Sequence, residues 1–335
     1  MTTLAIIGGG IAGRSLLYAL SSHHFKYEEI LFFDSPEFAS PCALNSTAIV
    51  APRGVSAGHS PLGDLILEGL AIFKQHCEKD HPAGVFPISQ YTGALTKLDQ
   101  FARRYPTALK VQNLGEIKLK AEVLFAEEEA FMIDPVLYLP WLTSQAEKKL
   151  SIRHIREFVI GLDKANSTIM TQNKAKYSAD HVVFATGSMS KHWKDLSTHP
   201  KLNSSKAIQG SYLEFSNIHW ELPTFSITLE GCNLIHRKHS GKVLIGSSTD
   251  ELAHNLPPIQ ELKRIYELLA NILELKLPAF DLGEVKVGHR EKAQKREPYL
   301  FTEGNVSFMG GFYKNGYSLS LRQSKSLVDQ LRELV

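Results

Sequence analysis

The sequence has few cysteines, and the three that occur, Cys42, Cys77 and Cys232, form no CxxC pair. Disulfide scaffolds and structural zinc sites need closely grouped thiols, so this pattern argues against both, and we expect no metal site. A sparse, odd set of thiols is typical of a reducing compartment, which predicts a cytoplasmic protein.

The sequence also lacks an excess of charge and a long apolar run. Lys and Arg total 37 against 35 Asp and Glu, and a net charge of +2 does not indicate a nucleic-acid binder. No uninterrupted apolar run reaches the roughly 18 residues of a membrane span, and the N-terminus lacks the basic region of a signal peptide. Hydrophobic residues make up 43% of the 335 residues, which is enough for a core, and the length predicts about two domains.

The first forty residues carry a glycine motif between two predicted strands. Residues 4–7 are apolar and predict a buried parallel strand, and residues 8–13, GGGIAG, read as G-x-G-x-x-G. Leucines at helical spacing follow, and then residues 30–33 predict a second strand that ends at Asp34. This order of strand, turn, helix, strand and acid is the context that a dinucleotide-binding motif requires.

Each residue of the motif has a physical role in such a site. Gly8 permits the tight turn, Gly10 lets a pyrophosphate approach the backbone, and Gly13 lets the helix pack close to the strand. The helix N-terminus offers N–H groups to the phosphates, and Asp34 can accept hydrogen bonds from ribose hydroxyls. Ser35 rather than an arginine follows the acid, which disfavours NADP. The motif alone leaves NAD and FAD open.

The remainder of the chain bears on that choice. An NAD enzyme continues with alternating strands and helices that complete a doubly wound sheet. Here the alternation breaks after the first unit, and residues 115–131 are charged and predicted to be irregular. A helix is expected at 140–150 and strands at 156–162 and 167–171. A buried strand at 180–187 then ends in Ala-Thr-Gly.

Four stretches of the chain resemble one known family. They are the glycine motif, the sequence ADHVVFATG at 179–187, a predicted hairpin at 234–249, and the segment 305–320. Together they resemble the FAD-dependent D-amino-acid oxidase superfamily, in the family's order and over nearly the whole chain. That group includes glycine oxidase, sarcosine oxidase and the oxidase half of the bifunctional enzyme that forms methylaminomethyl-thiouridine in tRNA.

The resemblance implies FAD as cofactor and an α/β fold. A discontinuous, Rossmann-like FAD-binding domain is expected beside a second, mostly antiparallel-sheet substrate domain. The expected FAD-binding segments are 1–80, 145–197 and 286–335, and the expected substrate-domain segments are 81–144 and 198–285.

The resemblance also implies where the flavin lies. A predicted strand at 306–309 leads into the loop 310–316, and a helix is expected at 318–334. In the family this loop runs beside the flavin ring. The positive end of the helix there stabilises the negative charge that reduced flavin carries at N1 and C2=O.

The loop at 41–52 departs from the family, because Ala43 and Ala48 stand where Ser and Gly are usual. Asn45, Ser46 and Thr47 are expected to supply the phosphate hydrogen bonds instead. The residues expected to bind the cofactor, from the motif and the resemblance together, are Gly8, Gly10, Ile11, Ala12, Gly13, Asp34, Asn45, Ser46, Thr47, Ala185, Thr186, Gly187, Gly311, Asn315 and Gly316.

The resemblance implies three catalytic residues. Arg290 ends a G-x-R pattern that in the family presents a guanidinium over the flavin, where it grips a carboxylate with two parallel hydrogen bonds. Glu291 and Lys295 stand where relatives usually carry Pro and Asp. Tyr313 and Lys314 are expected to border the flavin, and the lysine could help oxygen accept an electron by stabilising superoxide.

The expected activity is oxidation of a carbon–nitrogen bond in a small amine or amino acid, with hydride passing to flavin N5. Three alternatives stay open. Asn45 and the basic residues at 286–296 favour an oxidase of a modified tRNA wobble uridine, and the altered loop at 41–52 favours an FAD-binding subunit without turnover. An NAD dehydrogenase is the third alternative.

Overall fold

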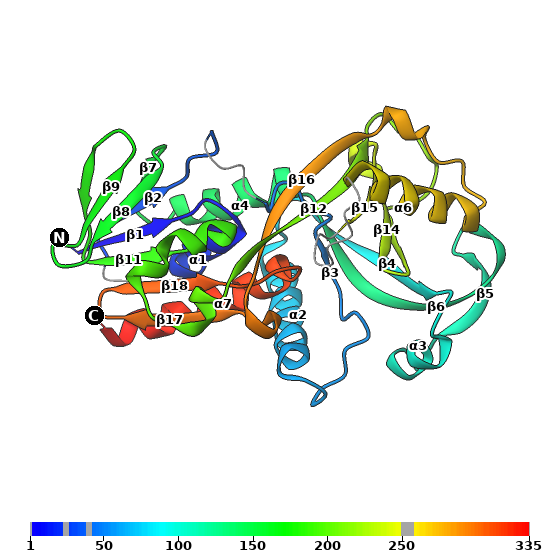
Figure 1. Ribbon diagram of the computed structural model, residues 1–335, viewed down its shortest axis with the longest axis horizontal. Helices are drawn as coiled ribbons and strands as arrows, with labels where there is room; N and C mark the ends of the chain where they lie inside the picture. The colour runs from blue at the N-terminus through cyan, green and yellow to red at the C-terminus, as the bar shows by residue number, and fades with distance from the viewer. Residues whose placement is uncertain (1, 23–26, 38–41, 249–257, 335) are drawn as a thin grey trace.

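The computed structural model describes residues 2–22, 27–37, 42–248 and 258–334. Two large sheets lie towards opposite ends of its long axis (Figure 1). Sheet A is six-stranded and almost wholly parallel, and sheet B is nine-stranded and almost wholly antiparallel. The predicted α/β class, a Rossmann-like unit beside a mostly antiparallel sheet, is confirmed.

Sheet A is assembled from three distant stretches of the chain. Its central strand pairs in parallel with neighbours from the N-terminal and middle stretches, and the C-terminal stretch completes one edge. In order across the sheet, the strands are β17 (Tyr299–Glu303), β18 (Val306–Gly310), β11 (His181–Phe184), β1 (Thr3–Ile7), β2 (Glu29–Phe33) and β7 (Ile152–Ile155).

Both faces of sheet A are covered, which explains why its central strands read as continuous apolar runs. On β1, Leu4 and Ile6 point to a helical layer, whereas Ala5 and Ile7 point to the opposite layer. The helical layer holds α1 (Ile11–Ser21), α2 (Pro61–Asp80), α4 (Pro135–Glu147) and α7 (Gly316–Leu334). The opposite layer holds β8 (Val159–Asp163), β9 (Thr168–Thr171), β10 (Lys176–Ser178) and the 3-10 segment η1 (Gly187–Leu196).

Sheet B forms the other half of the molecule. Within it, β13 and β4 pair in parallel, and its other pairs are antiparallel. In order, its strands are β16 (Glu284–Lys292), β12 (Lys206–Phe215), β15 (Lys242–Gly246), β14 (Cys232–Arg237), β13 (Phe225–Leu229), β4 (Val85–Ala94), β6 (Ile117–Ile133) and β3 (Ile49–Val50), with β5 (Leu109–Leu114) paired to β6 off this path. The predicted hairpin at 234–249 corresponds to β14 and β15, and its last residue, 249, lies outside the described residues.

The prediction that residues 115–131 are irregular was wrong, because most of this segment lies in the 17-residue strand β6. Its charges alternate with apolar residues at the period of a strand with one solvated face. Leu119 and Phe125 are buried against the core of sheet B, while Lys118 and Lys120 are exposed. The glutamates obscured this alternation in the sequence.

One face of sheet B is covered by α6 (Pro258–Ile272), whose Leu262, Ile265 and Leu269 are buried against it. The shorter helices are α3 (Leu98–Arg104), α5 (Pro200–Asn203) and the 3-10 turns η2 (Lys238–Ser240), η3 (Phe280–Leu282) and η4 (Gln294–Arg296). Within the described residues, no helix combines the length and apolarity needed to cross a membrane.

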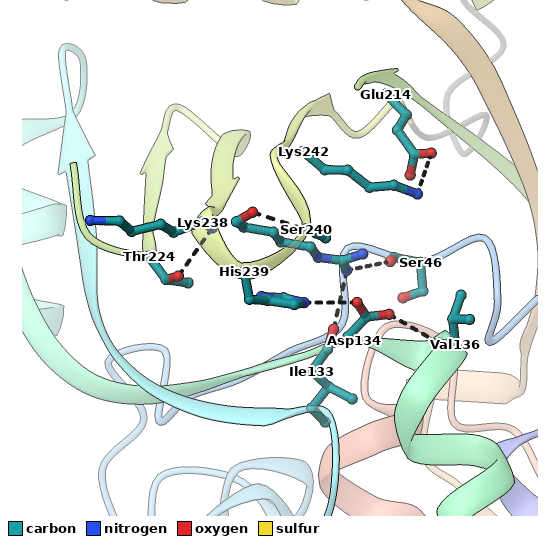
Figure 2. A network of polar contacts seen from close by, with 11 residues as sticks. Ser46, Ile133, Asp134, Val136, Glu214, Thr224, Lys238, His239, Ser240 and Lys242 are labelled. Atoms are coloured by element: carbon teal, nitrogen blue, oxygen red, sulfur yellow. Dashed lines mark hydrogen bonds and ion pairs between the residues drawn. The ribbon is translucent and has the colours of Figure 1, made fainter. Parts of the chain in front are cut away.

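A polar network joins the β14–β15 hairpin to the start of α4 (Figure 2). Asp134 caps α4 by accepting the Val136 N–H at 3.1 Å, and its other oxygen lies 2.9 Å from His239 Nε2. The buried Arg237 donates from Nη2 to the carbonyls of Ile133 at 3.1 Å and Ser46 at 3.5 Å. The hairpin of sheet B is thereby fixed both to α4 and to the loop that contains Ser46.

The division into two discontinuous domains stays a prediction. Its expected boundary at residue 286 falls inside β16, whose nine residues all pair with β12 in sheet B. The segment 135–144 belongs to α4, which packs on α1 in the helical layer of sheet A.

Candidate active site

A cavity of about 1020 Å³ lies between the carboxyl ends of sheet A and the near side of sheet B. Ligands of parallel α/β sheets bind at that end of the strands. The predicted residues that line this cavity are Gly8, Gly10, Ile11, Ala12, Asp34, Ser46, Thr47, Ala185, Thr186, Gly187, Arg290, Tyr313, Lys314 and Gly316. Three distant stretches of the sequence therefore meet here.

The first glycines make the turn from β1 into α1. Gly8 has φ +120°, a conformation that residues with a side chain rarely adopt. A Cβ there would also lie 2.4 Å from the Ala185 carbonyl oxygen, so the space for a side chain is missing as well. A Cβ at Gly10 would meet nothing within 4 Å, which leaves the α1 N-terminus open to the cavity. Gly13 serves packing, because a Cβ there would lie 2.0 Å from the Gly8 oxygen.

Asp34 lies at the carboxyl end of β2, on the cavity wall, where its partner is Arg14. Arg14 Nη2 donates to Asp34 Oδ2 at 2.6 Å, and the same guanidinium donates to Gly9 O at 2.8 Å and Thr143 Oγ1 at 2.6 Å. A Cβ at Gly9 would lie 1.9 Å from Asp34 Cγ. The carboxylate is therefore held against the glycine turn. Sequence reasoning missed Arg14, although it directly follows the motif.

The loop before β3 contributes Ser46 and Thr47 to the cavity, but Asn45 does not line it in the described part of the chain. Asn45 Nδ2 instead donates to Val287 O at 2.9 Å, which ties the loop to β16. Ala48 has φ +48° and donates its N–H to Ser46 Oγ at 3.2 Å. Glycine would adopt that conformation without strain, which explains why it is usual in relatives.

The C-terminal glycine loop connects β18 to α7. Gly316 begins α7 and lines the cavity, so the positive end of this helix faces the cavity as expected. Gly311 and Asn315 are buried behind that wall in the described structure. Gly311 has φ +74°, and Asn315 supports the helix start by accepting the Leu319 N–H at 2.9 Å. Their predicted contact with the cofactor stays a prediction.

Arg290 extends from β16 into the cavity and lies over β12. A Cβ at Gly210 would lie 2.4 Å from Arg290 Nη1, so a side chain at that position would displace the guanidinium. Gly288, two residues earlier on the same face, makes room in the same way for Cys42 and the carbonyl of Asn45, each 3.0 Å from its missing Cβ. The G-x-R pattern therefore has a packing reason.

Tyr313 and Lys314 both line the cavity. Tyr313 is 8% exposed, with φ +51°, and cations surround its ring. Lys314 Nζ lies 5.4 Å from the ring centroid, and Lys292 Nζ and Arg296 Cζ each lie 5.7 Å from it. These distances are typical of cation–π contacts.

Glu291 is a cavity residue that sequence analysis did not place in the site. It is 6% exposed, its Oε2 accepts the Gly311 N–H at 2.8 Å, and its Oε1 accepts the Tyr299 hydroxyl at 2.5 Å. Burial raises the pKa of Glu291 to about 7, although these two hydrogen bonds favour the charged form. A carboxylate that titrates near neutrality thus fixes the glycine loop.

Other cavity residues carry no motif that would identify them. They come from loops and strands of sheet B, and they include Arg53, Gln90, Thr92, Arg104 and Tyr105, together with His192 from η1. A single charged residue in a sequence does not indicate a site, because most arginines are exposed to solvent.

The chain's own residues fit FAD. The volume is at the upper end of the range for ligand pockets, as a dinucleotide requires. Gly10 leaves the space that a pyrophosphate needs beside an uncapped helix N-terminus, and Asp34 lines the same cavity at the end of β2, where a carboxylate suits ribose hydroxyls. Gly316 begins a second helix at the opposite wall.

Comparisons with known proteins agree with this geometry. The solved structures similar to this chain include glycine oxidase from Geobacillus kaustophilus, with a TM-score of 0.74 and 16% identity, covering 99% of this chain and 95% of that one. Iminodiacetate oxidase from Chelativorans gives 0.71 and 15%, covering 98% and 95%. L-α-glycerophosphate oxidase from Mycoplasma pneumoniae, solved with FAD bound, gives 0.73 and 14%, covering 99% and 95%.

No curated protein sequence matches the chain. The model of one family, described as FAD dependent oxidoreductase (DAO), matches residues 3–329. That match spans almost the whole chain and includes every segment that lines the cavity. The cofactor is FAD, and the protein belongs to the DAO family of FAD-dependent oxidoreductases.

Proposed function

We propose that this oxidoreductase oxidises a carbon–nitrogen bond of an amine that carries a carboxylate. The observation that carries the proposal is the position of Arg290, which reaches from sheet B into the cavity that the glycine turns of sheet A also line. A planar guanidinium binds a carboxylate through two parallel hydrogen bonds and so fixes the orientation of the attached α-carbon.

In this proposal FAD and the residues of the cavity have separate roles. FAD, when bound, supplies the chemistry by accepting a hydride equivalent from the α-carbon. Arg290 holds the substrate carboxylate, and Gly210 leaves free the space in which its guanidinium lies. Lys314 and Arg290 place positive charge along the cavity, which favours the neutral amine over its protonated form. Only the neutral amine has the lone pair that assists hydride loss.

The test is an anaerobic titration. Purified holoenzyme is mixed without oxygen with glycine, N-methylglycine, proline and D-amino acids, and the visible flavin absorbance is followed. We expect at least one carboxylated amine to bleach it. If none does while FAD stays bound, the proposed function is wrong.

Two variants on one strand show whether Arg290 acts as proposed. Arg290→Met should raise the KM for the bleaching amine about tenfold to a hundredfold, because charge-assisted hydrogen bonds contribute roughly 1.5–3 kcal/mol. Lys286→Met is the matched control, since it removes a cation from the same strand at a position that does not line the cavity among the described residues. Equal effects of the two substitutions would contradict the assignment.

A further inference from the structure

A second arginine lines the same cavity as Arg290. Arg53 lies just after β3, is only partly exposed, and adopts φ +58°. Its Nη2 donates to the Ile49 carbonyl at 3.3 Å. A non-glycine residue in the left-handed region is strained and persists only where its surroundings enforce it.

The surroundings of Arg53 do enforce it. Arg104, at the end of α3, donates from Nε to the Arg53 carbonyl at 3.1 Å and bonds the same oxygen through Nη2. The next N–H, of Gly54, donates to Glu128 Oε1 on β6 at 2.8 Å. A Cβ at Gly54 would lie 2.5 Å from Tyr105 Cζ, so the ring packs directly on the turn. The backbone is thus held from both sides.

A charged guanidinium is unfavourable at this position, and an anionic ligand would offset the unfavourable interaction. Burial lowers the pKa of the Arg53 guanidinium, and repulsion from Arg104 and Arg290 lowers it further. An arginine does not deprotonate under such conditions, so the charge persists. Glu128 partly offsets this repulsion, but its Oε1 already accepts the Gly54 N–H.

The neighbours of Arg53 indicate which ligand it faces. Arg104, Tyr105 and Glu128 belong to α3 and sheet B, on the substrate side of the cavity. The elements that fit the pyrophosphate, the Gly8–Gly10 turn and the α1 N-terminus, belong to sheet A. The contacts of the Arg53 segment are therefore with sheet B and α3 rather than with the glycine turn that fits the pyrophosphate.

We propose that Arg53 binds a second anionic group of the substrate, so that the preferred amine carries one carboxylate for Arg290 and a further carboxylate or phosphonate-type group for Arg53. This inference rests on the proposed function and narrows its substrate class. A guanidinium pairs in the same forked way with a carboxylate and with a phosphate-type group, so the chemistry shared by both is what the site recognises.

The experiment measures binding of three achiral probes to the holoenzyme without oxygen. For a probe that only perturbs the visible flavin spectrum, the size of the change against concentration gives the Kd. For a probe that bleaches the flavin, the concentration dependence of the bleaching rate gives the Kd. N-methylglycine carries one carboxylate, iminodiacetate carries two, and N-(phosphonomethyl)glycine carries a phosphonate in place of the second. We expect iminodiacetate to bind at least about tenfold more tightly than N-methylglycine. The phosphonate shows which of the two anionic groups the site prefers.

Substitutions then assign the difference. Arg53→Gln should weaken iminodiacetate about tenfold or more and leave N-methylglycine unchanged, whereas Arg290→Gln should weaken both. Arg103→Gln is the matched control, because this exposed arginine on α3 does not line the cavity. If Arg53→Gln does not fold, Arg53→Lys is the second variant. It keeps the positive charge but cannot form two parallel hydrogen bonds, so we expect its affinity for iminodiacetate to lie between those of the wild type and of Arg53→Gln.

Two results would overturn the inference: equal affinities of wild-type protein for the one-anion and two-anion probes, or Arg53 variants that affect both probes alike. The proposed function fails separately. If iminodiacetate binds through Arg53 but no amine bleaches the flavin, the oxidase proposal falls and the second anion site stands. If amines bleach the flavin and Arg53 makes no difference, only the second anion site falls.

Discussion

Substituting Glu291 by Gln tests whether the glycine loop is held by a group that titrates near neutral pH. Glutamine has the same shape, accepts the Gly311 N–H through its oxygen, and donates its amide to the Tyr299 hydroxyl, which can accept as well as donate. The substitution therefore removes the ionisation and keeps both contacts.

The magnitude follows from the raised pKa. Burial moves the pKa of Glu291 from 4.5 to about 7 in the folded protein, which corresponds to about 3 kcal/mol. Since the folded state prefers the protonated carboxyl, this stabilisation is fully present below pH 4.5 and is lost as the pH rises through 7. Wild-type protein and Glu291→Gln should then be about equally stable at acid pH. Above pH 7 the wild type should be less stable by about 3 kcal/mol.

The assay is reversible denaturation of both proteins at one fixed FAD concentration, with the difference in unfolding free energy plotted against pH. Other buried groups, such as His181, titrate equally in both proteins and cancel. Tyr299→Phe is a second probe. It removes a hydrogen bond that favours the charged carboxylate, so the pKa of Glu291 should rise further and the pH at which stability is lost should move upward.

A difference between wild type and Glu291→Gln that is constant over this pH range would refute the reasoning. So would a difference of the opposite sign, in which the wild type gains stability as the pH rises. The second result would mean that the Gly311 and Tyr299 hydrogen bonds outweigh burial and hold the carboxylate ionised.

Three further substitutions test the cavity walls. Gly8→Ala should abolish FAD retention on gel filtration, because the Cβ would lie 2.4 Å from a backbone oxygen in a left-handed conformation. Asp34→Asn removes the charge that pairs with Arg14 and that is expected to hold the ribose hydroxyls, so fluorescence titration of apoprotein should show about tenfold weaker FAD binding; unchanged affinity would contradict the predicted ribose contact. Gly210→Ala should displace the Arg290 guanidinium and raise the KM for a carboxylated amine while FAD binding stays intact; a lower affinity for FAD instead would place Arg290 against the cofactor.

The position of the glycine turns and of Asp34 at the cavity could be predicted because these residues sit at fixed offsets from strands. Gly8 and Gly10 follow β1, Asp34 follows β2, and Thr186 follows β11, and parallel strands bring such positions to one edge of a sheet. The family resemblance added Gly316 at the start of α7. In each case a local pattern carries the information.

The substrate side could not be predicted in this way. Arg53 and Arg104 come together because the turn after β3 contacts both the end of α3 and Glu128 of β6, and the sequence around β6 did not reveal a strand. Asn45 was expected to bind phosphate, but its amide is committed to Val287 O, a contact between segments more than two hundred residues apart. Such meetings depend on the three-dimensional course of the chain rather than on spacing.

The edge of sheet A formed by β17 and β18 is synthesised long after its other strands, which has a consequence for folding during synthesis. A ribosome delivers β1 and β11 long before β18, which must pair with β11, and α7 follows β18. Until then β11 presents an open hydrogen-bonding edge that can pair with other nascent chains, so assistance from chaperones is expected at this stage. Binding of the coenzyme is therefore expected only after β18 and α7 have joined the fold, and a variant that lacks residues 306–334 should be colourless.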